Sequence, residues 1–196
     1  MMIAPSEQIQ EIDMTEWGPL QALIGEWEGD GGLDSAFSHS RGEVLATPFR
    51  EKVTMKPFGP VDNGSQHLYG LDYRTAMWRG DEENPFHTEV GYWLWDGEAQ
   101  QVMRGFVVPR GITTLAGGTA APDATSFTMK AELGAPIYGI SENPYLNGAA
   151  STVRYEVAIT VGDDGSWSYA ENTTLHMKEF AEPFPHTDHN TLRRVS

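Results

Sequence analysis

Histidine and acidic side chains near the C-terminus are the first candidates for chemistry in this sequence. His186, Asp188 and His189 bring nitrogen and oxygen donors within four residues of one another. An H-x-x-H spacing places two rings on one face of a helix, whereas a strand points them to opposite faces. The cluster therefore indicates either a metal site or, more ordinarily, a turn over 186–188 in which His or Asp caps backbone groups.

A second candidate pair, His87 and Glu89, lies two residues apart, so both side chains share one face of an extended strand. The two groups could orient each other or bind a cation, although a solvated or hydrogen-bonded pair is the commoner outcome. The sequence contains no G-x-S-x-G elbow, no P-loop and no cysteine. We therefore nominate no catalytic nucleophile, and disulfides and zinc fingers are excluded.

The charge balance excludes further classes of function. The 196 residues include 28 acidic side chains and 13 Lys or Arg, a formal net charge of −15. A chain with this net negative charge repels phosphate groups. We therefore expect no nucleic-acid partner and no membrane binding through a basic patch. We expect the acidic side chains to lie mainly outside, around an apolar interior. The start of the chain shows no targeting pattern, which together with the lack of cysteine indicates a cytoplasmic protein.

The elements that position these groups are mainly strands. Apolar and polar residues alternate most clearly over 152–161, where Val153, Tyr155 and Val157 share one face. The 21 Gly and 12 Pro indicate many turns between short elements. One short helix is expected near the start, capped by Thr15 and ending before Gly25. We assign residues 1–14 to an N-terminal arm and 15–196 to a single domain.

We predict an all-β domain with about ten antiparallel strands joined by short turns. So many strands must close into a barrel or split into two sheets, because an open sheet of that size leaves costly edges. An up-and-down barrel is the first choice and a sandwich the second. Residues 134–150 are expected to form a loop with a short helical turn. The expected strands are 66–78, 86–95, 101–108, 112–116, 125–133, 152–161 and 167–177, with others near 27, 50–56 and 192–195.

A barrel of this size can leave an interior cavity for one apolar ligand, as lipocalins do. The alternative is that the large inward side chains simply fill the core. Buried tyrosine hydroxyls need partners, which favours a pocket that holds water or a polar ligand. The candidate ligand contacts are Trp27, Tyr69, Tyr73, Met77, His87 and Tyr155.

Four motifs occur in an order that resembles the nitrobindin family. Residues 25–31 read G-x-W-x-G-x-G, in which Trp27 is expected to plug the base of the barrel. The other three are PFHTEVGY at 85–92, VPRGIT at 108–113 followed by Gly117, and HNTLRR at 189–194. The resemblance covers roughly residues 17–196. It implies a ten-stranded barrel, related in architecture to fatty-acid-binding proteins, that hosts a hydrophobic ligand.

The resemblance also implies a cofactor. In the family's haem-binding members a His near the last strand ligates ferric haem, and these members bind nitric oxide and convert peroxynitrite to nitrate. Counting back from Leu192 without a gap puts that position at Thr187, between His186 and His189. One step along a strand turns a side chain to the opposite face, so His186 serves only if residues 183–185 shift the register or lie in a loop.

Two functions remain open at this point. The first is haem b binding, with His186 as the ligand to the haem iron, His189 as a further cofactor contact, and peroxynitrite isomerisation as the activity. The second is a haem-free carrier of a fatty acid or similar amphiphile, since other members of this barrel group lack haem. A filled barrel acting as an interaction protein is a third alternative. In each case we expect a monomer or homodimer.

Overall fold

The computed structural model of the protein describes residues 14–195, so nearly all of the expected N-terminal arm lies outside the described residues. No helix in this part of the chain is long and apolar enough to cross a membrane. The elements are η1 (Met14–Leu23), β1 (Gly25–Ser38), β2 (Glu43–Asn63), β3 (Gln66–Trp78), β4 (His87–Asp96), β5 (Gln101–Val108), β6 (Ile112–Thr119), β7 (Ser126–Leu133), β8 (Gly139–Glu142), α1 (Pro144–Ala149), β9 (Ala150–Val161), β10 (Trp167–Met177) and β11 (Phe184–Arg194).

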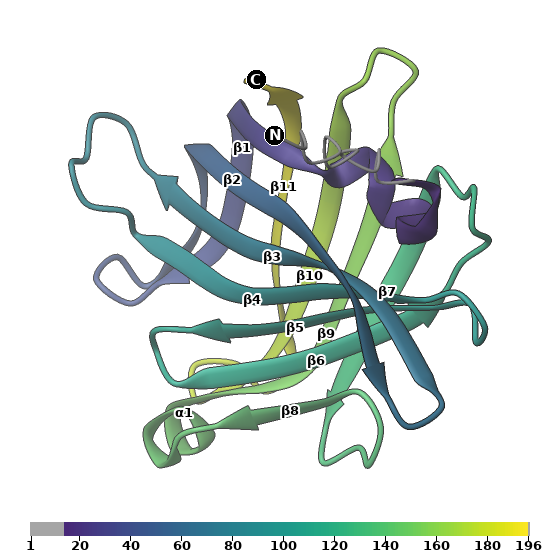
Figure 1. The fold of residues 1–196 in the computed structure, drawn as a ribbon. Helices are drawn as coiled ribbons and strands as arrows, with labels where there is room; N and C mark the ends of the chain where they lie inside the picture. The colour runs from purple at the N-terminus through teal and green to yellow at the C-terminus, as the bar shows by residue number, and fades with distance from the viewer. Residues whose placement is uncertain (1–13, 196) are drawn as a thin grey trace, which may run out of the picture.

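The strands close into one barrel, in the order β1-β11-β10-β9-β7-β8-β6-β5-β4-β3-β2 with β2 returning to β1 (Figure 1). This confirms the predicted barrel and rules out the sandwich. The one departure from an antiparallel meander is β8, which lies between β6 and β7 and runs parallel to β7. This strand falls in the segment expected to be a loop. It is only four residues long, too short to show an apolar alternation.

The G-x-W motif and the C-terminal Leu-Arg-Arg meet at one end of the barrel. Trp27 is 1% exposed and donates its indole N–H to the Leu23 carbonyl at 2.8 Å. The Arg194 guanidinium lies over the Trp27 ring at 4.4 Å and donates to the Ile24 carbonyl at 2.6 Å. Gly25 has a φ of 137°, and a Cβ there would lie 2.4 Å from Arg194 Nη1. The position therefore requires glycine.

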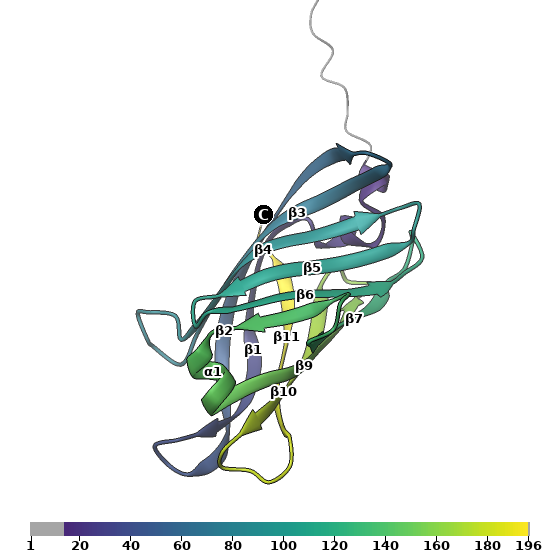
Figure 2. The ribbon, with the colours of Figure 1, turned by 90° about the horizontal axis from the view of Figure 1, so that it is seen from below.

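The same end is covered by η1, which packs Trp17, Leu20 and Leu23 into the core. The expected helix is present, but it is a 3-10 helix that is broken at Gly18. This residue directly precedes Pro19 and has a φ of 51°. The helices η1 and α1 lie at opposite ends of the barrel in both ribbon views (Figure 1, Figure 2). The end near α1 is therefore free of the η1 cover.

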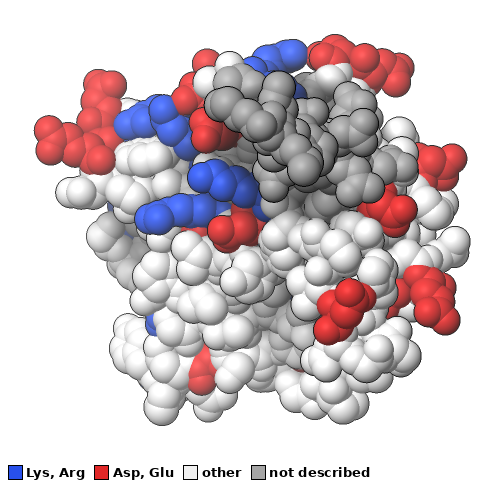
Figure 3. Space-filling view, in the orientation of Figure 1, with Lys and Arg blue, Asp and Glu red and all other residues white. Residues whose placement is uncertain are grey.

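Charged side chains divide between the surface and the interior. On the face shown in Figure 3, acidic groups gather along the edges, and a broad central area carries few charges. Several acidic side chains nevertheless lie inside the barrel, so its interior is not apolar throughout. The buried acidic residues are Asp34, Glu51 and Glu89.

Candidate functional site

The interior opens into a cavity of about 330 Å³ on the α1 side of the barrel. Leu146 of α1 forms part of its wall. That helix is fixed by Asn143, which accepts from the Leu146 N–H at 3.1 Å and donates to the Arg110 carbonyl at 2.6 Å. The β5–β6 turn, with its VPRGIT motif, is thereby joined to the cavity wall. Other apolar wall residues are Phe37, Phe49, Met77, Phe86, Phe106, Val108 and Leu175.

Five of the side chains nominated from the sequence line this cavity. They come from four different strands, β3, β4, β9 and β11, and closure of the barrel brings them together. They are Tyr73, Met77, His87, Tyr155 and His186.

Three other nominated residues lie outside the lining of this cavity. Trp27 is packed into the closed end, edge-on to Trp167 with ring centres 6.2 Å apart. Tyr69 contacts Trp17 under η1, at 4.8 Å between ring centres. His189 is exposed, because it lies an odd number of residues from the inward-facing side chains of β11.

The register of β11 decides between His186 and Thr187. Phe184, Asn190 and Leu192 are buried, so the even-numbered positions face the interior. His186 therefore faces the cavity, and the gap-free count to Thr187 selects the wrong face. The segment 186–188 is strand rather than the turn that the sequence also allowed.

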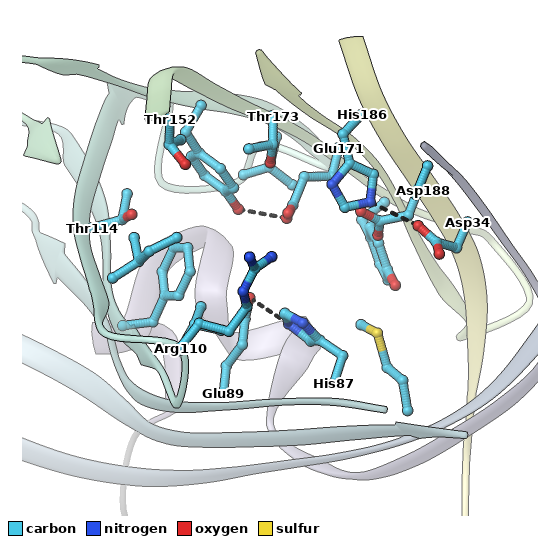
Figure 4. A pocket seen from close by; sticks show the side chains of 18 of the residues that line it. Asp34, His87, Glu89, Arg110, Thr114, Thr152, Glu171, Thr173, His186 and Asp188 are labelled. Atoms are coloured by element: carbon cyan, nitrogen blue, oxygen red, sulfur yellow. Dashed lines mark hydrogen bonds and ion pairs between the residues drawn. The ribbon is translucent and has the colours of Figure 1, made fainter. Parts of the chain in front are cut away.

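His186 is held by an acidic neighbour on β1. Its Nε2 lies 2.7 Å from Asp34 Oδ1, and Arg79 lies 3.5 Å from the other oxygen of Asp34. The His186 Nδ1 has no hydrogen-bond partner among residues 14–195. About a third of the His186 side chain is exposed, which places the ring in the accessible part of the cavity (Figure 4).

Arg104 of β5 is the centre of a buried polar network. Its Nη1 donates to Tyr155 and, at 3.0 Å, to Glu171; its Nη2 donates to Glu89 and, at 2.9 Å, to Tyr73. Arg104 is 5% exposed. Sequence reasoning missed this residue, although its place between Val102 and Phe106 on an inward face was a usable signal.

Glu89 is ionised within this network. Burial opposes its charge, but the Arg104 guanidinium and hydrogen bonding from His87 bring the pKa of Glu89 down to about 2. His87 Nε2 lies 3.2 Å from Glu89 Oε1, so the expected hydrogen-bonded pair is confirmed. Although burial acts against protonation of His87, this bond and the charge of Glu89 raise its pKa above the usual value.

Glu51 belongs to a neighbouring network. It accepts hydrogen bonds from Thr75 at 2.8 Å, Tyr169 at 2.9 Å and Asn190 at 3.1 Å. Burial raises the pKa of Glu51 despite these three bonds. The inner part of the cavity therefore combines one ionised carboxylate, Glu89, with a second carboxyl group that binds its proton more tightly than usual.

Asp188 lies between the two networks. It is the Cα partner of Glu171 on β10 and of Asp34 on β1, so three acidic residues stand side by side. Burial, followed by the charges of Glu171 and Glu51, raises the pKa of Asp188 well above its usual value. No side chain of the described residues donates a hydrogen bond to Asp188.

The donor geometry does not suit a directly bound metal ion. Residues 14–195 contain no group of three or more His, Asp or Glu side chains placed to hold one. The site instead combines an apolar mouth, an accessible imidazole and a polar floor. Such a cavity can bind an organic ligand or a cofactor that brings its own metal.

Comparisons with known proteins agree on the type of domain. Residues 16–194 match the family model described as "THAP4-like, heme-binding beta-barrel domain". A "Peroxynitrite isomerase" from Renibacterium salmoninarum is 35% identical over 95 residues, which cover 44% of this chain and 39% of that relative. The crystal structure of Rv2717c from M. tuberculosis has a TM-score of 0.60 at 18% identity, covering 91% of this chain and 98% of that one. The last likeness concerns the fold alone.

Proposed function

The chain belongs to the family of THAP4-like, heme-binding beta-barrel domains, and on that premise we propose that it binds haem b with His186 as the iron ligand. The observation that carries the proposal is the state of the His186 ring. Its Nε2 is bonded to Asp34, its Nδ1 has no partner among the described residues, and it faces the accessible part of the cavity. An imidazole whose second nitrogen is bonded to a carboxylate is a common arrangement for metal ligands.

Other donors in the cavity are less suited to ligate iron. His87 Nε2 is engaged by Glu89. The pKa values of Tyr73 and Tyr155 are raised well above the usual value, first by burial, so neither phenol is ready to lose its proton. The chain has no cysteine that could act as a thiolate ligand. The donor set therefore fits a haem bound through His186.

The mouth of the cavity suits an apolar macrocycle. Phe37, Met77, Phe86 and Leu175 line it and would pack against the porphyrin. Arg110, in the β5–β6 turn, lines the same cavity and would offset the negative charge of the propionates. When bound, haem would supply the iron centre for peroxynitrite isomerisation, the activity that names the relative from Renibacterium salmoninarum.

The chain's own residues would orient and shield this centre. Asp34 fixes the His186 ring through Nε2, and the apolar mouth limits the access of water. On the β4 wall, the bond to Glu89 raises the pKa of His87, and a protonated ring would have its second N–H free to donate within the cavity.

The haem-free fatty-acid carrier is the less favoured alternative. A fatty-acid carboxylate that entered head-first would meet Glu171 and Asp188, which line the cavity. The one buried guanidinium there, Arg104, is already bonded to two carboxylates. Repulsion between like charges therefore acts against an anionic head group in the interior.

Titration of the purified protein with hemin tests the proposal. We expect a saturable Soret band in the wild type and its loss or displacement in His186→Ala. His189→Ala is the matched control, because it removes an imidazole from the outer face of the same strand and should leave the spectrum unchanged. No saturable Soret change in the wild type, or a wild-type spectrum for His186→Ala, would refute His186 ligation.

A further inference from the structure

The outer surface of β4, β5 and β6 carries an apolar patch, the β4–β6 face. It consists of four side chains that point away from the cavity and are each between 43% and 53% exposed: Val90, Tyr92, Val107 and Leu115. Strand pairing makes them neighbours, because Val90 is the Cα partner of Val107, and Gly105 lies between Tyr92 and Leu115. Contiguous apolar side chains on a surface are typical of a site of protein association.

The β4–β6 face is free of charge, although the chain has a net charge of −15. The outward positions among 88–94 of β4, 103–107 of β5 and 113–117 of β6 hold no Asp, Glu, Lys or Arg. They belong to the area with few charges in Figure 3, where the strands β4 to β6 of Figure 1 face the viewer. Two copies of so acidic a chain repel each other over most of their surface. At this face they can approach without bringing acidic groups together.

Two opposite charges stand at the β3 edge of the β4–β6 face, two residues apart on the outward side of one strand. Asp72 and Arg74 are both exposed, and neither makes an ion pair or a side-chain hydrogen bond within residues 14–195. Asp72 is the Cα partner of Tyr92, and Arg74 is the Cα partner of Val90. Each charge therefore begins one of two adjacent rows of side chains that cross the face.

The strand registers define these two rows. The first row reads Asp72, Tyr92, Gly105 and Leu115, and the second reads Arg74, Val90, Val107 and Thr113. A two-fold axis that runs across the strands between the rows lays the first row of one copy on the second row of another. The same operation lays the second row on the first, which is the reciprocity that a symmetric dimer requires.

The contact made in this way is complementary in shape and in charge. Gly105 leaves a gap in the first row, where an added Cβ would have only the Leu115 side chain within 4 Å. Val107 of the second copy would cover that gap. Asp72 would face Arg74 of the second copy, and Arg74 would face its Asp72, so both charges find the partner that they lack within one chain.

We propose that the β4–β6 face binds a second copy of the chain, forming a symmetric homodimer in which Asp72 of each copy meets Arg74 of the other. An uncharged centre with charged groups at its rim is the usual composition of a protein interface. The proposal does not rest on haem binding. The inward side chains of these strands line the cavity, whereas the outward side chains make the contact.

Sedimentation equilibrium of the purified protein at micromolar to millimolar concentrations tests the proposal. We expect the wild type to approach twice the 21.7 kDa mass of the chain as the concentration rises. Val107→Lys puts a charge in the centre of the face and should give a monomer. Val44→Lys is the matched control, because Val44 is similarly exposed, at 48%, but lies on β2 outside the face. This control should form dimers like the wild type.

A charge swap tests which side chains meet. Arg74→Asp places like charges opposite each other twice in the symmetric interface, so it should weaken dimerisation on the order of tenfold or more. The double variant Asp72→Arg/Arg74→Asp restores two opposite pairs and should recover the dissociation constant of the wild type. Recovery of this kind is specific to a contact between two copies, because a different partner would not carry the matching swap.

Three results would overturn the proposal. The first is a wild type that stays monomeric at every concentration, which needs no variant and would leave the face to a different partner. The second is a Val107→Lys dimer as stable as that of the wild type. The third is an Arg74→Asp variant that dimerises normally, or whose loss of dimerisation the second substitution does not restore. Circular dichroism of each variant confirms that it is folded before its mass is compared.

Discussion

Glu171 and Asp188 lie directly opposite each other on β10 and β11, both facing the cavity, but only Glu171 contacts a guanidinium. That difference separates two roles. Glu171 belongs to the structural network around Arg104, whereas Asp188 has no side-chain hydrogen bond within residues 14–195. The interior is therefore organised as an apolar mouth above a polar floor with one carboxyl group in excess.

Removing the central guanidinium should destabilise the barrel. Arg104→Met leaves Glu89 and Glu171 buried without their cation, and we expect the free energy of unfolding to fall by about 3 kcal/mol. Urea denaturation at pH 7 measures it. Arg154→Met breaks an exposed pair with Glu156 and should change stability by less than about 1 kcal/mol. Equal effects of the two variants would contradict the assigned role of Arg104.

Glu89 should make the protein sensitive to acid. Its folded-state pKa of about 2 lies below the ordinary value of 4.5. Its contribution to stability is therefore fully present above pH 4.5 and is lost as the pH falls towards 2. We expect the urea midpoint to drop between pH 5 and pH 3 in the wild type and to drop less in Glu89→Gln. The exposed control Glu98→Gln should follow the wild type, and parallel curves for all three proteins would sink the prediction.

The carboxylate behind His186 should tune haem binding. Asp34 fixes the ring through Nε2, and losing such a partner typically costs about 10–100-fold in metal affinity. We expect Asp34→Asn to weaken hemin binding by a factor in this range, measured from the Soret band. Asp123→Asn, in the exposed turn between β6 and β7, serves as the charge-matched control. Unchanged hemin affinity in Asp34→Asn would show that the ring needs no such support.

The glycine in the PFHTEVGY motif should be irreplaceable for packing reasons. A Cβ on Gly91 would lie 2.0 Å from the Gly105 carbonyl oxygen of the neighbouring strand. We expect Gly91→Ala to lower the free energy of unfolding by about 3 kcal/mol, at the upper end for overpacking. Gly31→Ala meets nothing within 4 Å and should change it by less than about 0.5 kcal/mol. Thermal unfolding compares the two variants. Wild-type stability of Gly91→Ala would contradict the prediction, because it would show that β4 and β5 can move apart to make room for the methyl group.

The strands that were easiest to predict are those with strict apolar alternation. The expected ranges 66–78 and 101–108 coincide with β3 and β5. The first half of β11 was missed, because its inward positions include His186, Asp188 and Asn190, which carry no apolar signal. The two prolines at 183 and 185 reinforced the expectation of a loop. Polar side chains at inward positions thus hid the strand that matters most for the site.

The sequence by itself determined the all-β class, the inward faces of most strands and the placement of Tyr73, His87 and Tyr155 on them. These follow from a period of two residues, which is a local property of the chain. Only the tertiary structure decided that Arg104 meets Glu171 from 67 residues away, or that Asp188 stands between two other acids. Charged residues are expected outside, and a period of two says nothing about which charge lies across the barrel. Closure of the barrel and the register of its strands set which of these side chains meet, and these contacts determine the chemistry of the cavity.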